Sequence, residues 1–328
     1  METPLRIGLI GCGRAAERIY IPALSRLKEA RLVAAADPIS ERRDLISSSA
    51  PGCQAFSSAE ELFQEAEVAA VIVTTPSTTH IAVATVALNA GVSVLCEKPL
   101  APSMAGVEEL ETLVNSSRGL FMMGFNRRHW KAVNQLRQRT SKLRDHDKVS
   151  TELTTITNKQ AWASISEVND LLDDLGSHQL DLLRYIYGCE ISTISAHWVN
   201  GQEIRMRVKL RSGGIARCVA AYSKRVHEES VTVRCGHKKY RIHAGSDRTQ
   251  PASGMIRLLL DRSDAAIRNL RQKQSSFEDS YRSQLISFVT CVRTDSIPQP
   301  NIADGIKAIH AVEAARQSGA AHGMEVSI

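Results

Sequence analysis

The 328-residue sequence has no long apolar run and few aromatic side chains. None of its runs approaches the roughly 18 consecutive apolar residues that a membrane-spanning helix needs, so we expect no membrane partner. Aromatic residues make up 5% of the chain, which disfavours the base-stacking platforms that bind nucleic acid. The first residues lead straight into an apolar strand, without the basic and then apolar segments of a signal peptide. We therefore expect a protein that binds neither membranes nor nucleic acid.

Paired cysteines and a large net charge are also lacking. The seven cysteines are widely spaced, odd in number and include no CxxC, which disfavours disulfides and zinc. We accordingly expect a reducing, cytoplasmic location and no metal. Lys and Arg exceed Asp and Glu by 41 − 35 = 6, an excess that only mildly favours anionic small ligands. The composition, 43% apolar and 23% charged, excludes wholesale disorder, and the length suggests two domains.

Apolar runs and helical periodicity alternate through the first third of the chain. Runs that read as strands lie at residues 5–10, 31–36, 68–74, 92–96 and 119–124. Segments with helical periodicity lie between them, at residues 14–30, 60–66, 80–90 and 103–115. Apolar strands that alternate with helices are typical of a parallel sheet covered on both faces. We therefore predict an α/β domain with a parallel sheet over residues 1–125.

The pattern changes after residue 125. A basic amphipathic segment, a threonine-rich strand and a helix are expected at residues 126–148, 149–158 and 170–187. Closely spaced strands follow at residues 191–199, 204–210, 215–223, 230–235 and 240–244, and helices at 255–274, 280–292 and 304–318. Neighbouring strands without helices between them indicate antiparallel pairing. Residues 126–328 are therefore predicted to form an α+β domain with an open, mainly antiparallel sheet.

A glycine turn, GCGRAA at residues 11–16, follows the first strand and opens a helix. Gly11 permits a tight turn, Gly13 lets the backbone approach a pyrophosphate, and Ala16 lets the helix pack on the strand. The helix N-terminus, at Arg14 and Ala15, presents N–H groups to phosphates. The alternative is a turn that only packs a helix. Because strand, turn and helix occur in the required order, we predict dinucleotide binding.

Asp37 ends the second strand, 24 residues after Gly13. A carboxylate there accepts hydrogen bonds from the ribose 2′-hydroxyl and repels a 2′-phosphate, which favours NAD over NADP. Arg42 and Arg43 lie nearby in the sequence and can accommodate that phosphate, so NADP remains an alternative.

Polar residues follow the third and fourth strands, where ligands bind in an open α/β sheet. Thr75, Pro76 and His80 follow the third strand and are candidate cofactor contacts, although His80 at a helix start also fits a surface histidine. Glu97 and Lys98 follow the fourth. The Lys98 ammonium can orient a nicotinamide carboxamide or a substrate hydroxyl, and the alternative is a solvated lysine in a turn.

The helix at residues 170–187 carries a polar stripe beside an apolar one. Asp174, His178, Asp181 and Tyr185 lie at steps of four, three and four residues, so they share one helix face that can line a cleft. His178 is suited to take a hydroxyl proton near neutral pH. Asp174 can orient the imidazole or a substrate hydroxyl. The alternative is a solvated helix face, and no residues complete a metal ligand set.

The glycine turn, the Glu-Lys-Pro segment and the DxxxH helix, in this order, resemble the Gfo/Idh/MocA family, which includes glucose–fructose oxidoreductase and inositol dehydrogenase. The resemblance rests on GLIGCGRAA (8–16), AAADP (34–38), TTPSTTH (74–80), AGVSVLCEKPLA (90–101), GFNRRH (124–129), DLGSHQLDLLRYIYG (174–188) and DGIKAIHAVEAARQSG (304–319). It implies a Rossmann domain and an α+β domain whose sheet often builds homodimers or homotetramers. It also implies NAD(P)-dependent interconversion of a hydroxyl and a ketone on a sugar, sugar nucleotide or cyclitol.

The resemblance implies a catalytic trio. His178 is the general base, Lys98 assists proton transfer and positions substrate and nicotinamide, and Asp174 holds a hydroxyl at the reacting centre.

One segment departs from the family pattern. The family usually has a Gly-Gly pair before the DxxxH aspartate, whereas this chain has Asn169-Asp170 and an additional acid at Asp173. This departure motivates one alternative to a dehydrogenase, a non-catalytic nucleotide-binding sensor. The resemblance itself leaves a second alternative open, an NAD-dependent glycosidase with transient redox. No sequence pattern identifies the residues that contact the substrate. The candidates are Trp162, His197, Trp198 and Arg207, which are equally compatible with core or interface positions.

Overall fold

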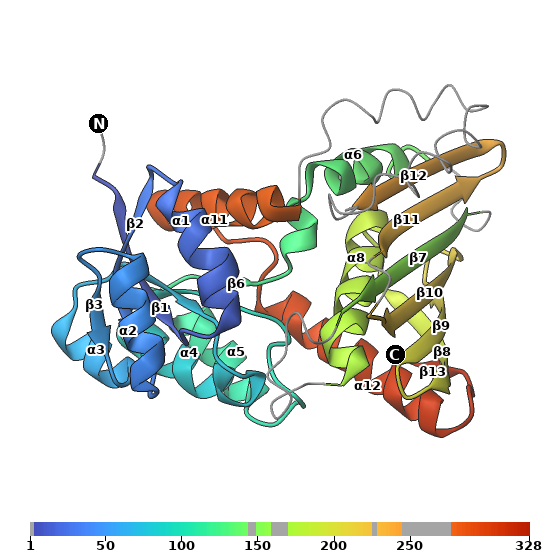
Figure 1. Cartoon of the computed structure of the whole chain (residues 1–328). Helices are drawn as coiled ribbons and strands as arrows, with labels where there is room; N and C mark the ends of the chain where they lie inside the picture. Colours follow the sequence, from blue (N-terminus) through green and yellow to red (C-terminus); the bar gives the residue numbers. More distant parts are fainter. Residues whose placement is uncertain (1–2, 144–148, 159–169, 225–227, 245–276) are drawn as a thin grey trace. The chain divides into compact units, whose positions relative to one another are not determined.

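The computed structural model describes residues 3–143, 149–158, 170–224, 228–244 and 277–328. The chain divides into two compact units (Figure 1). Residues 1–126 and 278–309 make up the first unit, and residues 127–277 and 310–328 make up the second. Trp162, Asn169 and the helix expected at residues 255–274 lie outside the described residues.

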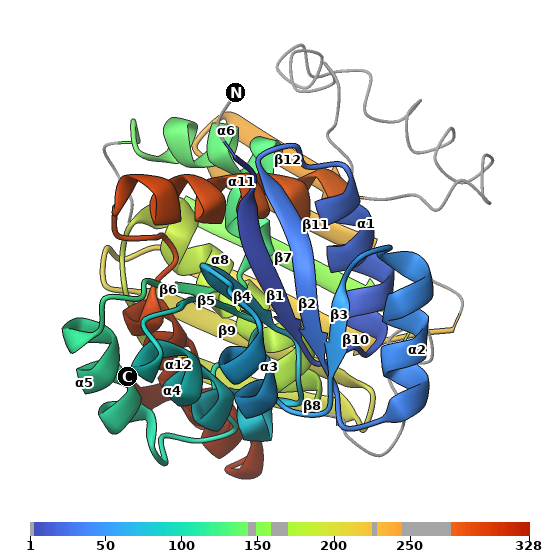
Figure 2. The same cartoon turned by 90° about the vertical axis from the view of Figure 1, so that its left-hand side faces the viewer.

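Six strands form the sheet of the first unit, in the order β3-β2-β1-β4-β5-β6 (Figure 2). All of the pairs are parallel. The strands are β1 (Leu5–Ile10), β2 (Ala30–Ala36), β3 (Gln54–Phe56), β4 (Ala70–Val73), β5 (Ser93–Cys96) and β6 (Phe121–Met123). Every residue of β4 and β5 is buried, as apolar strands covered on both faces require. The strand order reverses between β1 and β4, which makes their carboxyl ends the topological switch point of the sheet.

The helices of this unit pack against the sheet and one another. They are η1 (Ala16–Tyr20), α1 (Ile21–Ser25), α2 (Ser40–Ser49), α3 (Ala59–Glu65), η2 (Ser77–Thr79), α4 (His80–Asn89) and α5 (Val107–Ser116). α1 contacts β2, and α2 contacts both β2 and β3, whereas α4 contacts α3 on one side and α5 on the other. Ser58 caps α3, because its hydroxyl accepts a hydrogen bond from the Glu61 amide at 3.1 Å. This cap fixes where α3 begins and therefore where the loop after β3 ends.

Two segments from the C-terminal third complete the first unit. They are α11 (Phe277–Thr294) and the part of α12 (Ile302–Ala320) that precedes residue 310. The Met123 amide at the edge strand β6 donates to the Pro300 carbonyl at 2.9 Å, and Gln284 donates to the Met123 carbonyl at 3.2 Å. A side chain at Gly305 would lie 3.0 Å from the Met123 sulfur, so a glycine lets α12 approach closely. These contacts tie residues 278–309 to the sheet of the first unit.

The second unit contains a seven-stranded sheet in the order β12-β11-β7-β10-β9-β8-β13. Among the described strands of this unit, only the pair β7–β10 is parallel, and the other pairs are antiparallel. The strands are β7 (Val149–Thr157), β8 (Ile191–Asn200), β9 (Glu203–Leu210), β10 (Ile215–Tyr222), β11 (Glu228–Cys235), β12 (Lys238–Ala244) and β13 (Val326–Ser327). Alternate residues of β7 are buried, so one face of the sheet packs on a core. The predicted fold class, a parallel α/β sheet followed by a mainly antiparallel one, is confirmed.

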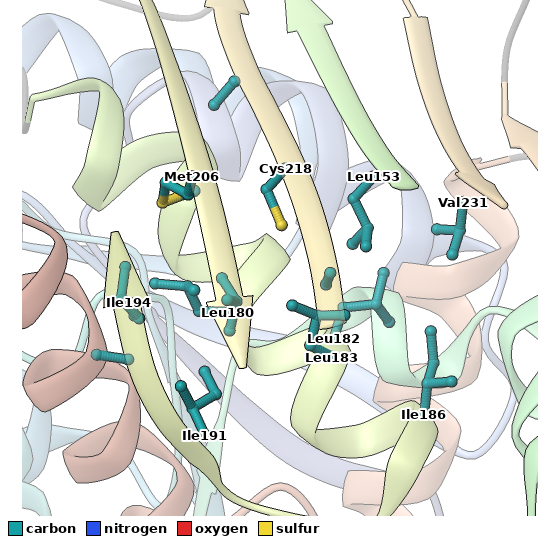
Figure 3. Close-up of a cluster of buried hydrophobic side chains, with 14 of the residues drawn as sticks. Leu153, Leu180, Leu182, Leu183, Ile186, Ile191, Ile194, Met206, Cys218 and Val231 are labelled. Carbon is teal, nitrogen blue, oxygen red and sulfur yellow. The ribbon is translucent and has the colours of Figure 1, made fainter. Parts of the chain in front are cut away.

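Helix α8 (Ser177–Tyr187) covers this sheet and is preceded by the π-helical turn η5 (Leu172–Gly176). Its leucines and isoleucine lie opposite Leu153, Met206 and Cys218 of the strands (Figure 3). The helix ends at Gly188, whose φ of 58° suits a residue without a side chain. η3 (Asn126–His129) and α6 (Lys131–Thr140) precede the first strand of the sheet. In the described parts of the chain, no helix is long and apolar enough to cross a bilayer.

Candidate active site

The glycine turn after β1 lies against the end of β4. Gly11 has a φ of +90°, and a Cβ atom there would lie 2.7 Å from the Thr75 amide, so only glycine fits. A Cβ atom on Gly13 would meet nothing within 4 Å, which leaves open space beside the turn. Ala16 is fully buried, as close packing of helix on strand requires. Residues 14–25, beginning at Arg14 and Ala15, are helical. The turn therefore fits the pyrophosphate of a dinucleotide, with Gly13 facing the space that the phosphates need.

Asp37, at the end of β2, is tied to this turn. Its Oδ2 accepts a hydrogen bond from the Cys12 amide at 2.7 Å, and its Oδ1 accepts one from the Ile39 amide at 2.9 Å. Arg42 lies 3.5 Å from Oδ2, and Arg43 donates to the Asp37 carbonyl at 2.7 Å. The carboxylate is 2% exposed. Asp37 thus holds the glycine turn in addition to its predicted contact with the ribose.

Thr75, Pro76 and His80 follow β4. The His80 side chain is 1% exposed, and its ring nitrogens lie 2.8 Å from the carbonyls of Thr75 and Pro99. Burial lowers its pKa, so the ring is neutral at pH 7. The alternative of a surface histidine is therefore wrong. Thr75 Oγ1 has no hydrogen-bond partner among the described residues, and Pro76 is exposed. An unpartnered hydroxyl beside the glycine turn fits a contact that a bound dinucleotide supplies.

Glu97 and Lys98 follow β5, and Glu97 is held from two directions. Its Oε1 accepts a hydrogen bond from the Tyr20 hydroxyl at 2.6 Å, and its Oε2 accepts one from the Lys98 amide at 3.0 Å. Burial and the nearby Glu97 charge raise the pKa of Tyr20, so its hydroxyl stays protonated and donates. The sequence contains no motif that marks Tyr20, because its partner lies 77 residues away.

In the second unit, Asp174 lies in the π turn η5 and His178 in the first turn of α8. His178 is 6% exposed, and Asp174 is half-buried. The Tyr222 hydroxyl at the end of β10 donates to Asp174 Oδ2 at 3.0 Å. Burial and the Asp174 carboxylate raise the pKa of Tyr222 well above its usual range, so the hydroxyl remains a donor. Single π-helical turns within α-helices occur frequently at functional sites. Sequence reasoning missed Tyr222.

The acidic departure from the family pattern has a structural role. Asp170 Oδ1 accepts hydrogen bonds from the amides of Leu172 and Asp173, at 2.9 and 3.0 Å, and so caps the helix. Arg316 of α12 donates to Asp170 Oδ2 at 2.9 Å and to Asp173 Oδ2 at 3.1 Å. The guanidinium therefore compensates the charge that Asp173 places beside Asp174. Arg316 also carries no sequence signal, because its partners lie more than 140 residues away.

The C-terminal half of the predicted polar stripe, at Asp181 and Tyr185, contacts other segments of the second unit. Asp181 is 1% exposed and accepts hydrogen bonds from Arg128 Nε at 2.9 Å and Nη2 at 2.5 Å. Arg184 lies 3.7 Å from the same carboxylate. The Tyr185 hydroxyl donates to Asn134 Oδ1 at 2.5 Å. Asp181 and Tyr185 thereby fasten α8 to the segment that precedes β7. Because Asp181 is buried against Arg128, the prediction that it lines a cleft is wrong.

The remaining candidates divide between surface and packing positions. His197 and Arg207 are exposed on β8 and β9. Trp198 packs against Gly319, where a Cβ atom would lie 2.9 Å from the indole nitrogen. The residues of the predicted trio come from both units, Lys98 from the first and Asp174 and His178 from the second. Among the residues that the structure describes, no three His, Cys, Asp or Glu side chains gather as a metal site.

A parallel sheet in this strand order, with a glycine turn after β1 and an acid after β2, defines a dinucleotide-binding protein of the Rossmann type. Residues 5–125 match the family model described as oxidoreductase family, NAD-binding Rossmann fold. Residues 170–328 match the C-terminal alpha/beta domain of the same oxidoreductase family. The chain therefore belongs to the Gfo/Idh/MocA family of oxidoreductases, and its cofactor is NAD.

Curated relatives include dehydrogenases of cyclitols and sugars. The chain is 35% identical over 125 residues to inositol 2-dehydrogenase 4 of Saccharopolyspora erythraea, a match that covers 38% of this chain and 37% of that protein. It is 24% identical over 339 residues to glucose-6-phosphate 3-dehydrogenase of Bacillus subtilis, covering 94% of each.

Solved structures share the fold along the whole chain. Myo-inositol 2-dehydrogenase from Lactobacillus plantarum superposes with a TM-score of 0.83 at 20% identity, covering 99% of each chain. Scyllo-inositol dehydrogenase from Lactobacillus casei, solved with NAD(H) and scyllo-inositol, has a TM-score of 0.82 at 18% identity, again over 99% of each.

Proposed function

We propose that the chain is an NAD-dependent dehydrogenase that interconverts a secondary hydroxyl and a ketone on a cyclitol, sugar or sugar nucleotide. The observation that carries the proposal is the pair Asp174 and His178, one helical turn apart, with Asp174 held by the Tyr222 hydroxyl at 3.0 Å. A carboxylate fixed beside a histidine provides a hydrogen-bond acceptor for a hydroxyl and a base for its proton. NAD, when bound, accepts the hydride from the carbon that bears this hydroxyl.

Each predicted residue has a role in this proposal. His178 removes the hydroxyl proton, Asp174 accepts a hydrogen bond from a substrate hydroxyl, and the Lys98 ammonium orients substrate and nicotinamide. The cofactor contacts are the glycine turn, the helix start and the strand ends, at Gly11, Gly13, Arg14, Ala15, Asp37, Thr75, Pro76, His80, Glu97 and Lys98. Asp37 supports a preference for NAD, whereas Arg42 and Arg43 beside it leave NADP as a weaker alternative.

The domain roles follow the same proposal. Residues 1–125 bind the dinucleotide, and residues 126–328 bind the substrate and form a homodimer or homotetramer. The seven free cysteines support a reducing compartment, the cytoplasm, for this activity.

The proposal is tested by following NADH formation by its ultraviolet absorbance. The panel contains myo-inositol, scyllo-inositol, glucose 6-phosphate and a UDP-sugar. We expect turnover with at least one of them, and a loss of about 10²-fold or more in His178→Ala and Lys98→Ala. His322→Ala removes an exposed histidine and serves as the matched control, with unchanged turnover.

Three results would contradict the proposal. Wild-type turnover in His178→Ala would remove its general base. Cleavage of glycosides with no net NADH would assign the chain to NAD-dependent glycosidases. NAD binding without turnover of any panel member or glycoside would favour the non-catalytic sensor.

A further inference from the structure

The backbone on either side of Lys98 is held by side chains from other elements. On its N-terminal side, the Glu97 carboxylate bridges the Tyr20 hydroxyl and the Lys98 amide, at 2.6 and 3.0 Å. On its C-terminal side, the Pro99 carbonyl lies 2.8 Å from the His80 ring. A lysine side chain is a flexible stem of four carbons, which by itself does not fix the ammonium. The position of the ammonium therefore depends in part on how firmly the lysine backbone is held.

Tyr20 reaches Glu97 from the helix that the glycine turn opens. It is the last residue of the π turn η1 and is completely buried. Its ring packs edge-on against Tyr281 of α11, with the centroids 5.8 Å apart. This packing leaves the phenol little freedom to move, so its hydroxyl is a fixed donor rather than an adaptable one. Tyr20 therefore connects the dinucleotide turn to the segment that contains Lys98.

Gly124 leaves the space that the Glu97 carboxylate occupies. A Cβ atom on Gly124 would lie 3.0 Å from Glu97 Oε2 and 2.8 Å from its Cα. The Gly124 amide also donates to the Cys96 carbonyl at 2.6 Å, which holds the two segments together. The Glu97 carboxylate therefore lies between the Tyr20 hydroxyl and the backbone of Gly124.

Loss of the Tyr20 hydroxyl would leave one carboxylate oxygen without this neutral donor in a partly buried place. A carboxylate in that situation turns toward water or another donor, because an unmade hydrogen bond to a charged group is costly. Turning Glu97 withdraws its other oxygen from the Lys98 amide, since both oxygens belong to one rigid group. Loss of the Tyr20 hydroxyl therefore shifts the position of Lys98 but leaves its side chain present.

We infer that Tyr20 is a positioning residue, which fixes the Glu97 carboxylate through its hydroxyl and thereby fixes the backbone of Lys98. The inference rests on the proposed function, in which Lys98 contacts substrate and nicotinamide. Nothing in the glycine-turn pattern requires a hydroxyl at this position, so the assignment comes from the contacts alone.

The test compares kcat and KM of Tyr20→Phe, Glu97→Gln and their double variant on the best substrate of the panel. Tyr20→Phe keeps the ring that packs on Tyr281, and a displaced catalytic group costs up to about 10²-fold, so we expect kcat to fall about tenfold. The KM for the polyol stays within about twofold, because the effect concerns the reacting geometry. The double variant is no slower than the slower single variant, since both changes break one connection.

Tyr187→Phe is the matched control. It deletes the same atom from another buried tyrosine, whose hydroxyl hydrogen-bonds to Thr151 in the second unit. Its kcat is expected to be unchanged, although its melting temperature falls as that of Tyr20→Phe does.

Each other outcome overturns a specific statement. A Tyr20→Phe variant with lowered melting temperature and unchanged kcat would make the tyrosine merely structural. Multiplying effects in the double variant would show that Tyr20 does not act through Glu97. If kcat falls about 10²-fold in Lys98→Ala but is unchanged in Tyr20→Phe, this inference alone is refuted. If Lys98→Ala retains wild-type turnover, the proposed role of the lysine is refuted as well.

Discussion

Replacement of Asp181 by asparagine should destabilise the second unit strongly. Asp181 is 1% exposed and receives two hydrogen bonds from Arg128, with Arg184 at 3.7 Å. Breaking a buried ion pair by neutralising one partner leaves a buried cation and typically costs about 3–5 kcal/mol. Asparagine keeps one acceptor oxygen, so we expect about 3 kcal/mol. For a unit of this size each kcal/mol lowers the melting temperature by about 2–4 °C, which gives a decrease of about 9 °C.

Calorimetry of the full chain measures this effect, because it resolves the melting of two units if they unfold separately. Glu152→Gln is the control, since the Glu152–Arg234 pair is exposed at 3.4 Å and contributes at most about 1 kcal/mol. Replacing both partners, Arg128→Met with Asp181→Leu, should restore most of the lost stability. A shift for Asp181→Asn no larger than that of Glu152→Gln would refute the reasoning. A double variant as unstable as Asp181→Asn would do the same.

Three other variants test the site and its surroundings. Gly13→Ala should fold normally but bind NAD about tenfold or more weakly by fluorescence titration, because its methyl enters the space for the phosphates; equal binding would contradict this. Gly11→Ala should instead lower the melting temperature, since its Cβ would lie 2.7 Å from the Thr75 amide. Burial lowers the pKa of His129 to about 4. Below about pH 6.5 this histidine therefore binds a proton in the unfolded chain but not in the folded chain. As the pH is lowered to about 4, the free energy of unfolding decreases by at most about 1.4 kcal/mol per pH unit. In urea unfolding, His129→Gln should show a shallower pH dependence over that range.

Elements with an apolar run or an apolar face are predicted from the sequence, whereas α2 and β3, which have neither, are missed. β4 is wholly apolar and β5 is apolar apart from the buried Ser93, and apolar runs predict both strands. α2, with the sequence SERRDLISSS, has no apolar stripe, and β3 contributes a single buried residue, Phe56. Apolar periodicity records burial, so a polar surface helix and a three-residue edge strand give no signal.

The candidate site shows the same limit in another form. Periodicity placed Asp174, His178 and Asp181 on one helix face, but it does not say what that face meets. Arg128 covers this face at Asp181, whereas Tyr222 contacts it at Asp174. Tyr222 and Arg316 reach the acids from 48 and more than 140 residues away, and only the folded chain brings such partners together.

The ring of His80 has a further consequence for the cofactor edge of the sheet. Its two nitrogens face two carbonyls, those of Thr75 and Pro99, each at 2.8 Å. A neutral imidazole carries one N–H and can donate to one of them at a time. The loop after β4 and the loop after β5 therefore compete for a single proton. The tautomer with Nδ1–H donates to Pro99 and so holds the segment that follows Lys98, whereas the tautomer with Nε2–H donates to Thr75.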